Sequence, residues 1–365
     1  MRVLHVLNEL RPSGAETMLR VAAKSWQRQG IAGEILSTGE TTGPYADALR
    51  EAGYRIHHLP FSRSLRFLAD FFLFVRRREF DVVHLHSERA TFWYAALARA
   101  AGKRRLVRTI HAAFDFDGML RMRRGLQRWV MRRVFGLQMA ACSESVARLE
   151  WERFRNPVSV LKNWFDSDFY RPTTDARRDT GETLVLVTVG NCAAVKNHNA
   201  VLRALVRLPN VEYLHAGCEG VGLEERALAQ ELGVAERVRF LGMVTDLRLV
   251  FRSADLFVMP SFQEGFGIAA VEAMGAGLPV LLADVEGLRD FGECSDAIRF
   301  CAPESSAIEE AVRRFMAVPA MERAAAGAAL SEMAHRTFGV AAGAERYTAL
   351  YRGALPEGNA REVAA

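Results

Sequence analysis

Short runs of apolar residues alternate with longer amphipathic segments along most of the chain. The apolar runs predict strands at residues 3–7, 33–37, 81–85, 106–110 and 137–142, and then at 184–189, 211–215, 238–240, 256–259 and 279–283. The segments between them are long enough for helices, as at 17–29 and 221–232. Nearly continuous apolar strands that are separated by helices indicate parallel sheets covered on both faces. Two such series predict an α/β protein with two doubly wound domains.

The boundary between the two series of strands predicts how the domains divide. We expect an N-terminal domain over residues 1–165, a link over 166–182 and a C-terminal domain over 183–340. A helical pattern resumes at about 340–355, and we expect that helix to pack back on the N-terminal domain. The helical pattern fades after that, and we expect residues 356–365 to form a loose tail. Two domains also fit a length of 365 residues, at ~150 residues per domain.

Charge divides along the chain in a similar way. Residues 1–170 carry 28 Lys and Arg against 17 Asp and Glu, a net charge of +11, whereas residues 171–365 carry 20 against 26, a net charge of −6. A basic half indicates an anionic partner, such as nucleic acid, a membrane surface or a phosphorylated substrate.

The five cysteines have no C-x-x-C spacing, which argues against a disulfide framework and favours the cytoplasm. No apolar run reaches the ~20 residues of a membrane-spanning helix.

The loop after the predicted strand at 256–259 has the densest polar chemistry. Glu264 stands there beside Gly265 and Gly267, and a helix is expected to open at about Gly267. Glycine amides and a helix N-terminus bind anions. Glu264, and Glu272 about one turn into the helix, can accept hydrogen bonds from hydroxyl groups. A ligand that joins phosphates to hydroxyl groups, such as a sugar nucleotide, suits this pattern.

These residues resemble the retaining glycosyltransferases of the GT-B fold, in the large family 4. Glu264 and Glu272 match the E-x7-E element of that family, inside its P-S-x-x-E-G-F-G and G-x-P-V context. The resemblance extends to the donor loop at 12–16, the D-V-V-H-x-H segment at 81–87, the active-site histidine at His111, the interdomain link at 161–172, and the G-R-x4-K phosphate loop at 190–196. Asn191 departs from the family, which usually has Arg there, so one expected phosphate-binding cation is missing.

The resemblance implies two Rossmann-like domains that face each other across a cleft, and a retaining, metal-independent hexosyltransferase. It implies a nucleotide-sugar donor, by preference a UDP-hexose, and a lipid-linked or polysaccharide acceptor in cell-surface polysaccharide synthesis. No cofactor is implied, since the nucleotide-sugar is a substrate. The implied catalytic residues are His111, Lys196 and Glu264. The implied donor-binding residues are Gly14, Gly190, Asn191, Lys196, Glu264, Gly265, Phe266, Gly267, Ile268 and Glu272.

Other functions fit parts of the pattern. Residues 265–270 match the G-x-G-x-x-A of an NAD-dependent dehydrogenase, but five residues separate the strand from the first glycine. A sugar-nucleotide 2-epimerase of the same fold would turn over donor without an acceptor, and a non-catalytic member would only bind it. Asp115 and Asp117 form a D-x-D pattern, the metal–diphosphate clamp of the other large glycosyltransferase fold, which we interpret as a surface or acceptor-side loop.

A basic segment at 119–135 allows two interpretations. Its helix either packs an apolar side into the core and leaves its arginines in solvent, or its arginines contact anionic lipid or the phosphates of the acceptor. The second implies a peripheral protein on the inner face of the cytoplasmic membrane. Nucleic acid is not favoured, because no recognition module accompanies the basic residues. The arginines concerned are Arg121, Arg124, Arg128 and Arg132, and the apolar side comprises Met119, Met122, Leu126, Trp129 and Val130.

Three histidines lie at or near the ends of predicted strands. We expect His84 and His86, of the strand at 81–85, to face opposite ways and so to be mainly structural. His111 follows the strand at 106–110, at a carboxyl end where the sites of α/β proteins open, and a functional role is favoured there.

Overall fold

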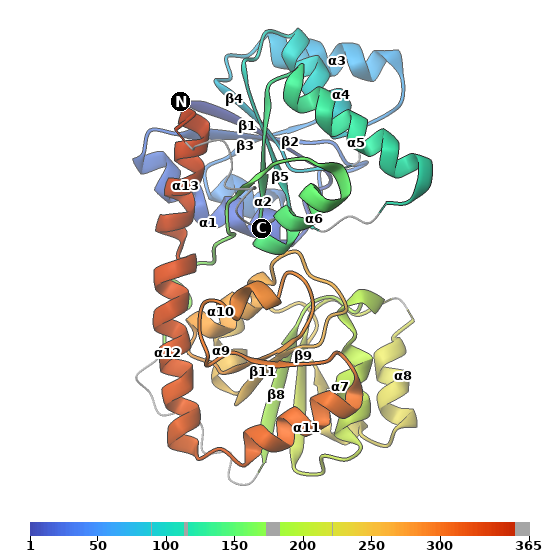
Figure 1. Cartoon of the computed structure of the whole chain (residues 1–365), viewed down its shortest axis with the longest axis vertical. Helices are drawn as coiled ribbons and strands as arrows, with labels where there is room; N and C mark the ends of the chain where they lie inside the picture. Colours follow the sequence, from blue (N-terminus) through green and yellow to red (C-terminus); the bar gives the residue numbers. More distant parts are fainter. Residues whose placement is uncertain (89, 113–115, 173–182, 221, 355–365) are drawn as a thin grey trace. The chain divides into compact units, whose positions relative to one another are not determined.

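The structure is a computed structural model that describes residues 1–88, 90–112, 116–172, 183–220 and 222–354. The chain divides into two compact units (Figure 1). The first unit comprises Met1–Trp164 and the helix that begins at Val340, and the second comprises Phe165–Gly339. The tail expected at 356–365 lies outside the described residues, as does most of the link expected at 166–182.

The first unit is built on a seven-stranded sheet in the order β3-β2-β1-β4-β5-β6-β7, in which neighbouring strands are parallel. Its strands are β1 (Arg2–Leu7), β2 (Ala32–Ser37), β3 (Arg55–His58), β4 (Val82–Leu85), β5 (Arg105–Ile110), β6 (Leu137–Ala141) and β7 (Ser159–Val160). Its helices before residue 165 are α1 (Gly14–Arg28), α2 (Ala46–Glu51), α3 (Leu65–Arg76), α4 (Thr91–Ala100), α5 (Gly118–Arg133) and α6 (Glu144–Phe154).

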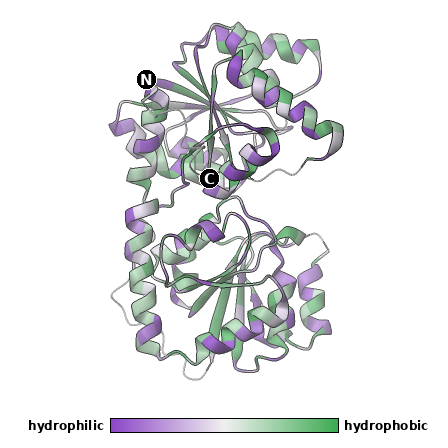
Figure 2. Cartoon of the chain, in the orientation of Figure 1, coloured by the Kyte–Doolittle hydropathy of each residue, from purple (hydrophilic) through white to green (hydrophobic). Residues whose placement is uncertain are grey.

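The second unit has a six-stranded parallel sheet in the order β10-β9-β8-β11-β12-β13. Its strands are β8 (Leu184–Val189), β9 (Val211–Ala216), β10 (Val238–Phe240), β11 (Leu256–Met259), β12 (Val280–Ala283) and β13 (Arg299–Cys301). The central strands are hydrophobic along their length (Figure 2). Its helices are α7 (His198–Leu205), α8 (Glu224–Glu231), α9 (Leu247–Arg252), α10 (Ile268–Gly275), α11 (Ser305–Met316) and α12 (Ala320–Phe338), with short 3-10 turns that include η1 (Ala194–Lys196).

The last described helix, α13 (Val340–Arg352), belongs to the first unit. It buries Tyr347 and Tyr351 against β-sheet residues, and its Ala344 carbonyl accepts a hydrogen bond from the Trp26 indole at 3.1 Å. Two doubly wound parallel-sheet units confirm the predicted fold class. None of the helices in the described part of the chain is long and apolar enough to cross a membrane.

Each sheet has one point, called its switch point below, where the chain order reverses between two neighbouring strands. In the first unit this point lies between β1 and β4, and in the second between β8 and β11. Ligands of doubly wound sheets bind beyond the carboxyl ends of the strands at such a point. Each unit therefore offers one candidate site.

Candidate functional site

Lys196 and Glu264 lie next to each other at the switch point of the second unit. Lys196 ends the η1 turn after β8, and Glu264 lies in the loop after β11. The Lys196 Nζ donates to Glu264 Oε1 at 2.6 Å, and the Ser261 hydroxyl donates to the same oxygen at 2.8 Å. The Glu264 side chain is 10% exposed and that of Lys196 is 30% exposed. The pair therefore combines an ammonium that is partly exposed to solvent with a carboxylate that is nearly buried.

Asn197 fixes the loop that carries Lys196. Its backbone adopts a left-handed conformation with φ of 56°, which asparagine tolerates better than most residues. Its side-chain amide donates to the carbonyls of Pro260 at 2.9 Å and Pro303 at 2.7 Å. The two loops are therefore held together at their bases. Sequence reasoning missed Asn197, although an asparagine directly before a helix is a recognisable signal.

Two glycines shape the loop that carries Glu264. Gly267 has φ of 80° and precedes α10, and Gly287 has φ of 84° where a side chain would strike the Glu264 carbonyl. Only glycine adopts such backbone conformations at no steric cost. The amides at the start of α10, which begins at Ile268, consequently follow Glu264 directly. Phe266 packs on core rings of the second unit, so its backbone is the part available to a ligand.

The predicted donor residues Gly190 and Asn191 lie in the neighbouring loop, after β8. The Asn191 side chain accepts from the Cys218 amide at 3.3 Å, so the residue that replaces the usual arginine braces the loop. The carbonyls of Gly190 and Asn191 accept from His215 at 3.0 Å and from His198 at 3.3 Å. Burial lowers the pKa of both histidines, that of His198 to about 3, so both are neutral donors. Glu272 is buried one turn into α10.

The switch point of the first unit gathers four histidines. His5 lies on β1, His84 on β4, His86 directly after β4 and His111 directly after β5. The rings of His84 and His86 have centroids 3.9 Å apart. The prediction that these two face opposite ways is wrong, because residues two positions apart along a strand share a face. These four histidines therefore form one cluster.

Hydrogen bonds connect three of these rings in a row. His5 Nδ1 lies 3.1 Å from His86 Nε2, and His86 Nδ1 lies 3.0 Å from His111 Nε2. His84 instead pairs with the Tyr351 hydroxyl and with Thr109, both at 2.8 Å. His5, His84 and His86 also have ring nitrogens within 4.8 Å of one another, a spacing at which neutral imidazoles can hold a metal ion.

Burial keeps this cluster uncharged. It lowers the pKa of His5 to about 3, and it lowers the pKa of His111 to about 4 with a smaller effect from the positive charge of Arg108. The pKa values of His84 and His86 are well below the usual range for the same reason, with neighbouring histidines contributing. All four rings are therefore neutral at physiological pH.

Two further sequence patterns lie near this edge. Gly14 is the exposed first residue of α1, after the loop that follows β1. The D-x-D pattern is only partly described, since Asp115 lies outside the described residues, while Asp117 immediately precedes α5.

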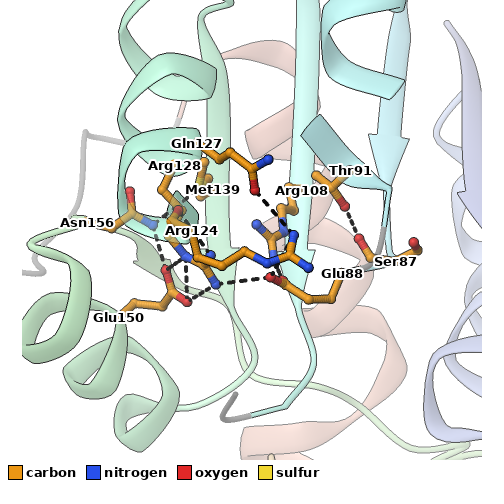
Figure 3. Close-up of polar contacts among 10 residues, drawn as sticks. All are labelled: Ser87, Glu88, Thr91, Arg108, Arg124, Gln127, Arg128, Met139, Glu150 and Asn156. Carbon is orange, nitrogen blue, oxygen red and sulfur yellow. Dashed lines mark hydrogen bonds and ion pairs between the residues drawn. The ribbon is translucent and has the colours of Figure 1, made fainter. Parts of the chain in front are cut away.

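Helix α5 packs with arginines toward the core and with its large apolar side chains in solvent. This is the opposite of the first interpretation of its sequence, in which the apolar side is buried. Arg128 is 1% exposed, and its Nε and Nη2 donate to the two carboxylate oxygens of Glu150 at 2.8 Å (Figure 3). Glu88 forms ion pairs with Arg108 of β5 and, at 3.9 Å, with Arg124. The expected row of solvent-facing arginines is therefore wrong for Arg124 and Arg128. The reason is that Glu88 and Glu150 place buried carboxylates beneath this helix.

The apolar side of α5 faces away from the unit that carries it. Met119 is 85% exposed, Met122 76%, Leu126 62% and Trp129 54%. The predicted residue Arg121 is exposed and donates to the Arg153 carbonyl at 3.3 Å, whereas Arg132 is half-buried. The four large apolar side chains form a continuous stripe, called the α5 stripe below, because they recur every three or four residues.

Both halves of the chain match families of glycosyltransferases. Residues 12–169 match the family model described as Glycosyltransferase Family 4, and residues 173–330 match that of Glycosyl transferases group 1. The chain is 27% identical to the putative glycosyltransferase EpsF of Bacillus subtilis over 78% of this chain and 79% of that protein. It is 41% identical to the D-inositol 3-phosphate glycosyltransferase of Mycobacterium marinum, over 36% of this chain and 31% of that protein.

A similar fold occurs in a solved structure. The crystal structure of Anabaena HepE in complex with UDP-glucose has a TM-score of 0.81 with this chain at 19% identity, covering 97% of this chain and 100% of that one.

Proposed function

Because this chain belongs to the group 1, family 4 glycosyltransferases of GT-B fold, we propose that it transfers a hexose from a UDP-sugar, with retention of configuration. The observation that carries the proposal is the Lys196–Glu264 pair beside the start of α10. A relative of the same fold has been crystallised with UDP-glucose, which supports the choice of donor. The acceptor that we propose is a lipid-linked or growing saccharide of a cell-surface polysaccharide.

In this proposal the second unit binds the donor. Breaking the bond between sugar and diphosphate leaves negative charge on the diphosphate, and a positioned cation or amide is most effective where that charge develops. Lys196 supplies the cation, and the amides from Gly265 to Ile268, together with the Gly190 loop, supply hydrogen bonds. Glu264 accepts from sugar hydroxyls and Glu272 from the ribose. Asn191 brings no charge, so the electrostatic part depends on Lys196.

The acceptor side of the proposal belongs to the first unit. Its Gly14 loop adds amide contacts to the phosphates, and His111 contacts the transferred sugar. The acceptor oxygen bonds to the anomeric carbon from the face that the diphosphate leaves, and the acceptor proton passes to the leaving phosphate oxygen. Configuration is thereby retained in one step, with no metal ion taking part.

We also place the first unit on the inner face of the cytoplasmic membrane. The α5 stripe gives an apolar surface that suits the boundary between headgroups and acyl chains. Arg121, Arg123 and Arg133 are exposed on the same helix, and basic residues near an anionic surface contribute ~1 kcal/mol each. The buried Arg128 has no part in this contact.

A panel of sugar nucleotides tests the function. Donors are screened for thermal stabilisation of the full chain and then for release of nucleoside diphosphate with and without a lipid-linked saccharide. Acceptor-dependent release from one donor is the expected result. Conversion of the donor without any acceptor would instead indicate the 2-epimerase, and binding without turnover a non-catalytic protein. The dehydrogenase is not supported, because the loop at 260–264 separates β11 from Gly265.

A further inference from the structure

The three hydrogen-bonded imidazoles of the first unit form a chain that ends at His111. Its two links are His5 Nδ1 to His86 Nε2 at 3.1 Å and His86 Nδ1 to His111 Nε2 at 3.0 Å. The rings of His86 and His111 are stacked, with planes 19° apart. One ring lies on β1, and the others directly follow β4 and β5, three neighbouring strands of the sheet, so backbone hydrogen bonds fix their spacing.

Because the three rings are neutral, the protons in this row of hydrogen-bonded imidazoles can lie in only a few arrangements. A neutral imidazole has one N–H donor and one nitrogen lone pair. Each nitrogen–nitrogen contact therefore needs a donor on one side and an acceptor on the other, and both contacts must run in the same direction. Either every ring carries its proton on Nδ1, or every ring carries it on Nε2.

The surroundings of His5 distinguish the two arrangements. His5 is fully buried, and its Nε2 has no hydrogen-bond partner among the residues that the structure describes. With protons on Nε2, this nitrogen would be a buried N–H without an acceptor, which folded proteins rarely contain. With protons on Nδ1, His5 donates to His86, His86 donates to His111, and only a lone pair is left at the buried end.

We propose that His86 and His5 are positioning residues that fix the proton of His111 on Nδ1, so that His111 offers its substrate an N–H donor. This inference rests on the proposed function only for the identity of that substrate. The group that suits such a donor is an oxygen, either a sugar hydroxyl or a phosphate oxygen of the donor. His111 then stabilises an oxygen and does not act as the base that removes the acceptor proton.

His84 provides a matched control within the same cluster. It is fully buried, as His5 is, but its two nitrogens pair with Tyr351 and Thr109 and not with the row of three rings. Replacing it removes contacts to α13 and lowers stability. It should not change which nitrogen of His111 carries the proton.

Nitrogen NMR of the full-length protein, with 15N in its histidine rings, tests the proposal without substrate. The expected spectrum at pH 7.5 shows His111, His86 and His5 protonated on Nδ1, in wild type and in His84→Gln. Protonation of His111 on Nε2 would overturn the proposal. So would a metal ion that co-purifies at one equivalent and resists EDTA, because it would engage the same nitrogens.

Two substitutions of His86 separate positioning from structure. His86→Leu removes the donor to His111, and we expect a mixture of His111 protonation states and a kcat lower by roughly 10- to 100-fold, with the donor KM within about two-fold. His86→Gln keeps an amide N–H for His111 and an oxygen for His5, so it should restore the Nδ1 form and most of kcat. Equal loss in both variants, with an unchanged His111 spectrum, would refute the role. If the protein transfers no sugar yet shows the predicted spectrum, only the proposed function fails.

Discussion

The ammonium of Lys196 lies 2.6 Å from a carboxylate oxygen of Glu264, although 68 residues separate the two along the chain. They come from loops after β8 and β11, the neighbouring strands at the switch point of the second sheet. The pair leaves the ammonium exposed enough to turn toward an anion while Ser261 still donates to the carboxylate. In the function that we propose, the donor diphosphate takes the place of Glu264 as the partner of Lys196.

We expect Lys196→Ala and Glu264→Ala each to lower kcat by about 10²- to 10³-fold, since each removes a group that acts on developing charge or on the sugar. The double variant should lose little more than either single one, because the two residues act together. Nucleoside diphosphate release measures the loss. Arg314→Ala, at an exposed ion pair on α11, is the control and should match wild type. Wild-type rates in either site variant would contradict the assignment.

Asn191→Arg should restore the cation that the family usually has. A new contact to the donor phosphates of about 1 kcal/mol would lower the donor KM roughly five-fold and make it more sensitive to salt. Asn191→Ala, which removes the contact with the Cys218 amide but adds no charge, is the control. An unchanged KM and salt response in Asn191→Arg would show that this position does not face the phosphates.

The α5 stripe should hold the protein on anionic vesicles. We expect Leu126→Ser combined with Trp129→Ser to reduce co-sedimentation with phosphatidylglycerol vesicles by ten-fold or more, because two large exposed apolar groups are lost. Thermal stability should stay within a degree or two. Met321→Ser, at a side chain that is 84% exposed in the second unit, should bind as wild type does. Equal binding by all three proteins would remove the membrane proposal.

Arg128 and Arg121 should differ sharply in stability, although both lie on α5. Arg128→Ala leaves the buried carboxylate of Glu150 without its bidentate partner, and we expect the free energy of unfolding to fall by about 3–5 kcal/mol. Arg121→Ala, at an exposed site, should change it by less than about 0.5 kcal/mol. Denaturant unfolding followed by circular dichroism compares them. Similar values would mean that the arginine side of α5 faces solvent after all.

Acid should destabilise the first unit through its buried histidines. The folded pKa values of His5 and His111, about 3 and about 4, lie below the unfolded value of about 6.5. The unfolded chain therefore binds protons that the folded chain does not, and each ring costs ~1.4 kcal/mol of stability per pH unit as the pH falls from about 6.5 toward its folded pKa. Unfolding measured from pH 8 to pH 5 should show constant stability above about pH 7 and a steep loss below pH 6. A flat profile would contradict buried neutral rings.

The sequence predicted most of the strands, chiefly from runs of apolar residues, because a strand that is buried on both faces is largely apolar along its length. It missed β3, β7 and β13, which are short edge strands or carry polar residues such as His57 and Arg299. The loops of Lys196 and Glu264 were predicted as one site from the resemblance to the family, and the order of strands in the structure places both loops at the same edge of the sheet. Asn197, by contrast, was missed: its place before a helix is visible in the sequence, but its contacts with the carbonyls of Pro260 and Pro303 depend on the folded chain.

Helix α5 shows why a pattern of polar and apolar residues does not fix which side is inward. Its two faces are equally regular in sequence, so the outcome depends on what lies beneath. Glu88 and Glu150 are distant in the chain, and their carboxylates turn the arginine face inward. The prediction that His84 and His86 face opposite ways was wrong for a simpler reason: residues two positions apart along a strand lie on the same face.

The return of α13 to the first unit sets an order of events during synthesis. The sheet of that unit is complete by residue 160, but His84 and Thr109 receive the hydroxyls of Tyr351 and Tyr347 only after the whole second unit has been made. The second unit is continuous in sequence and can fold as soon as it leaves the ribosome. The unit that is translated first is therefore the one that finishes folding last. A chain that ends before residue 340 lacks the tyrosines that pair with His84 and Thr109.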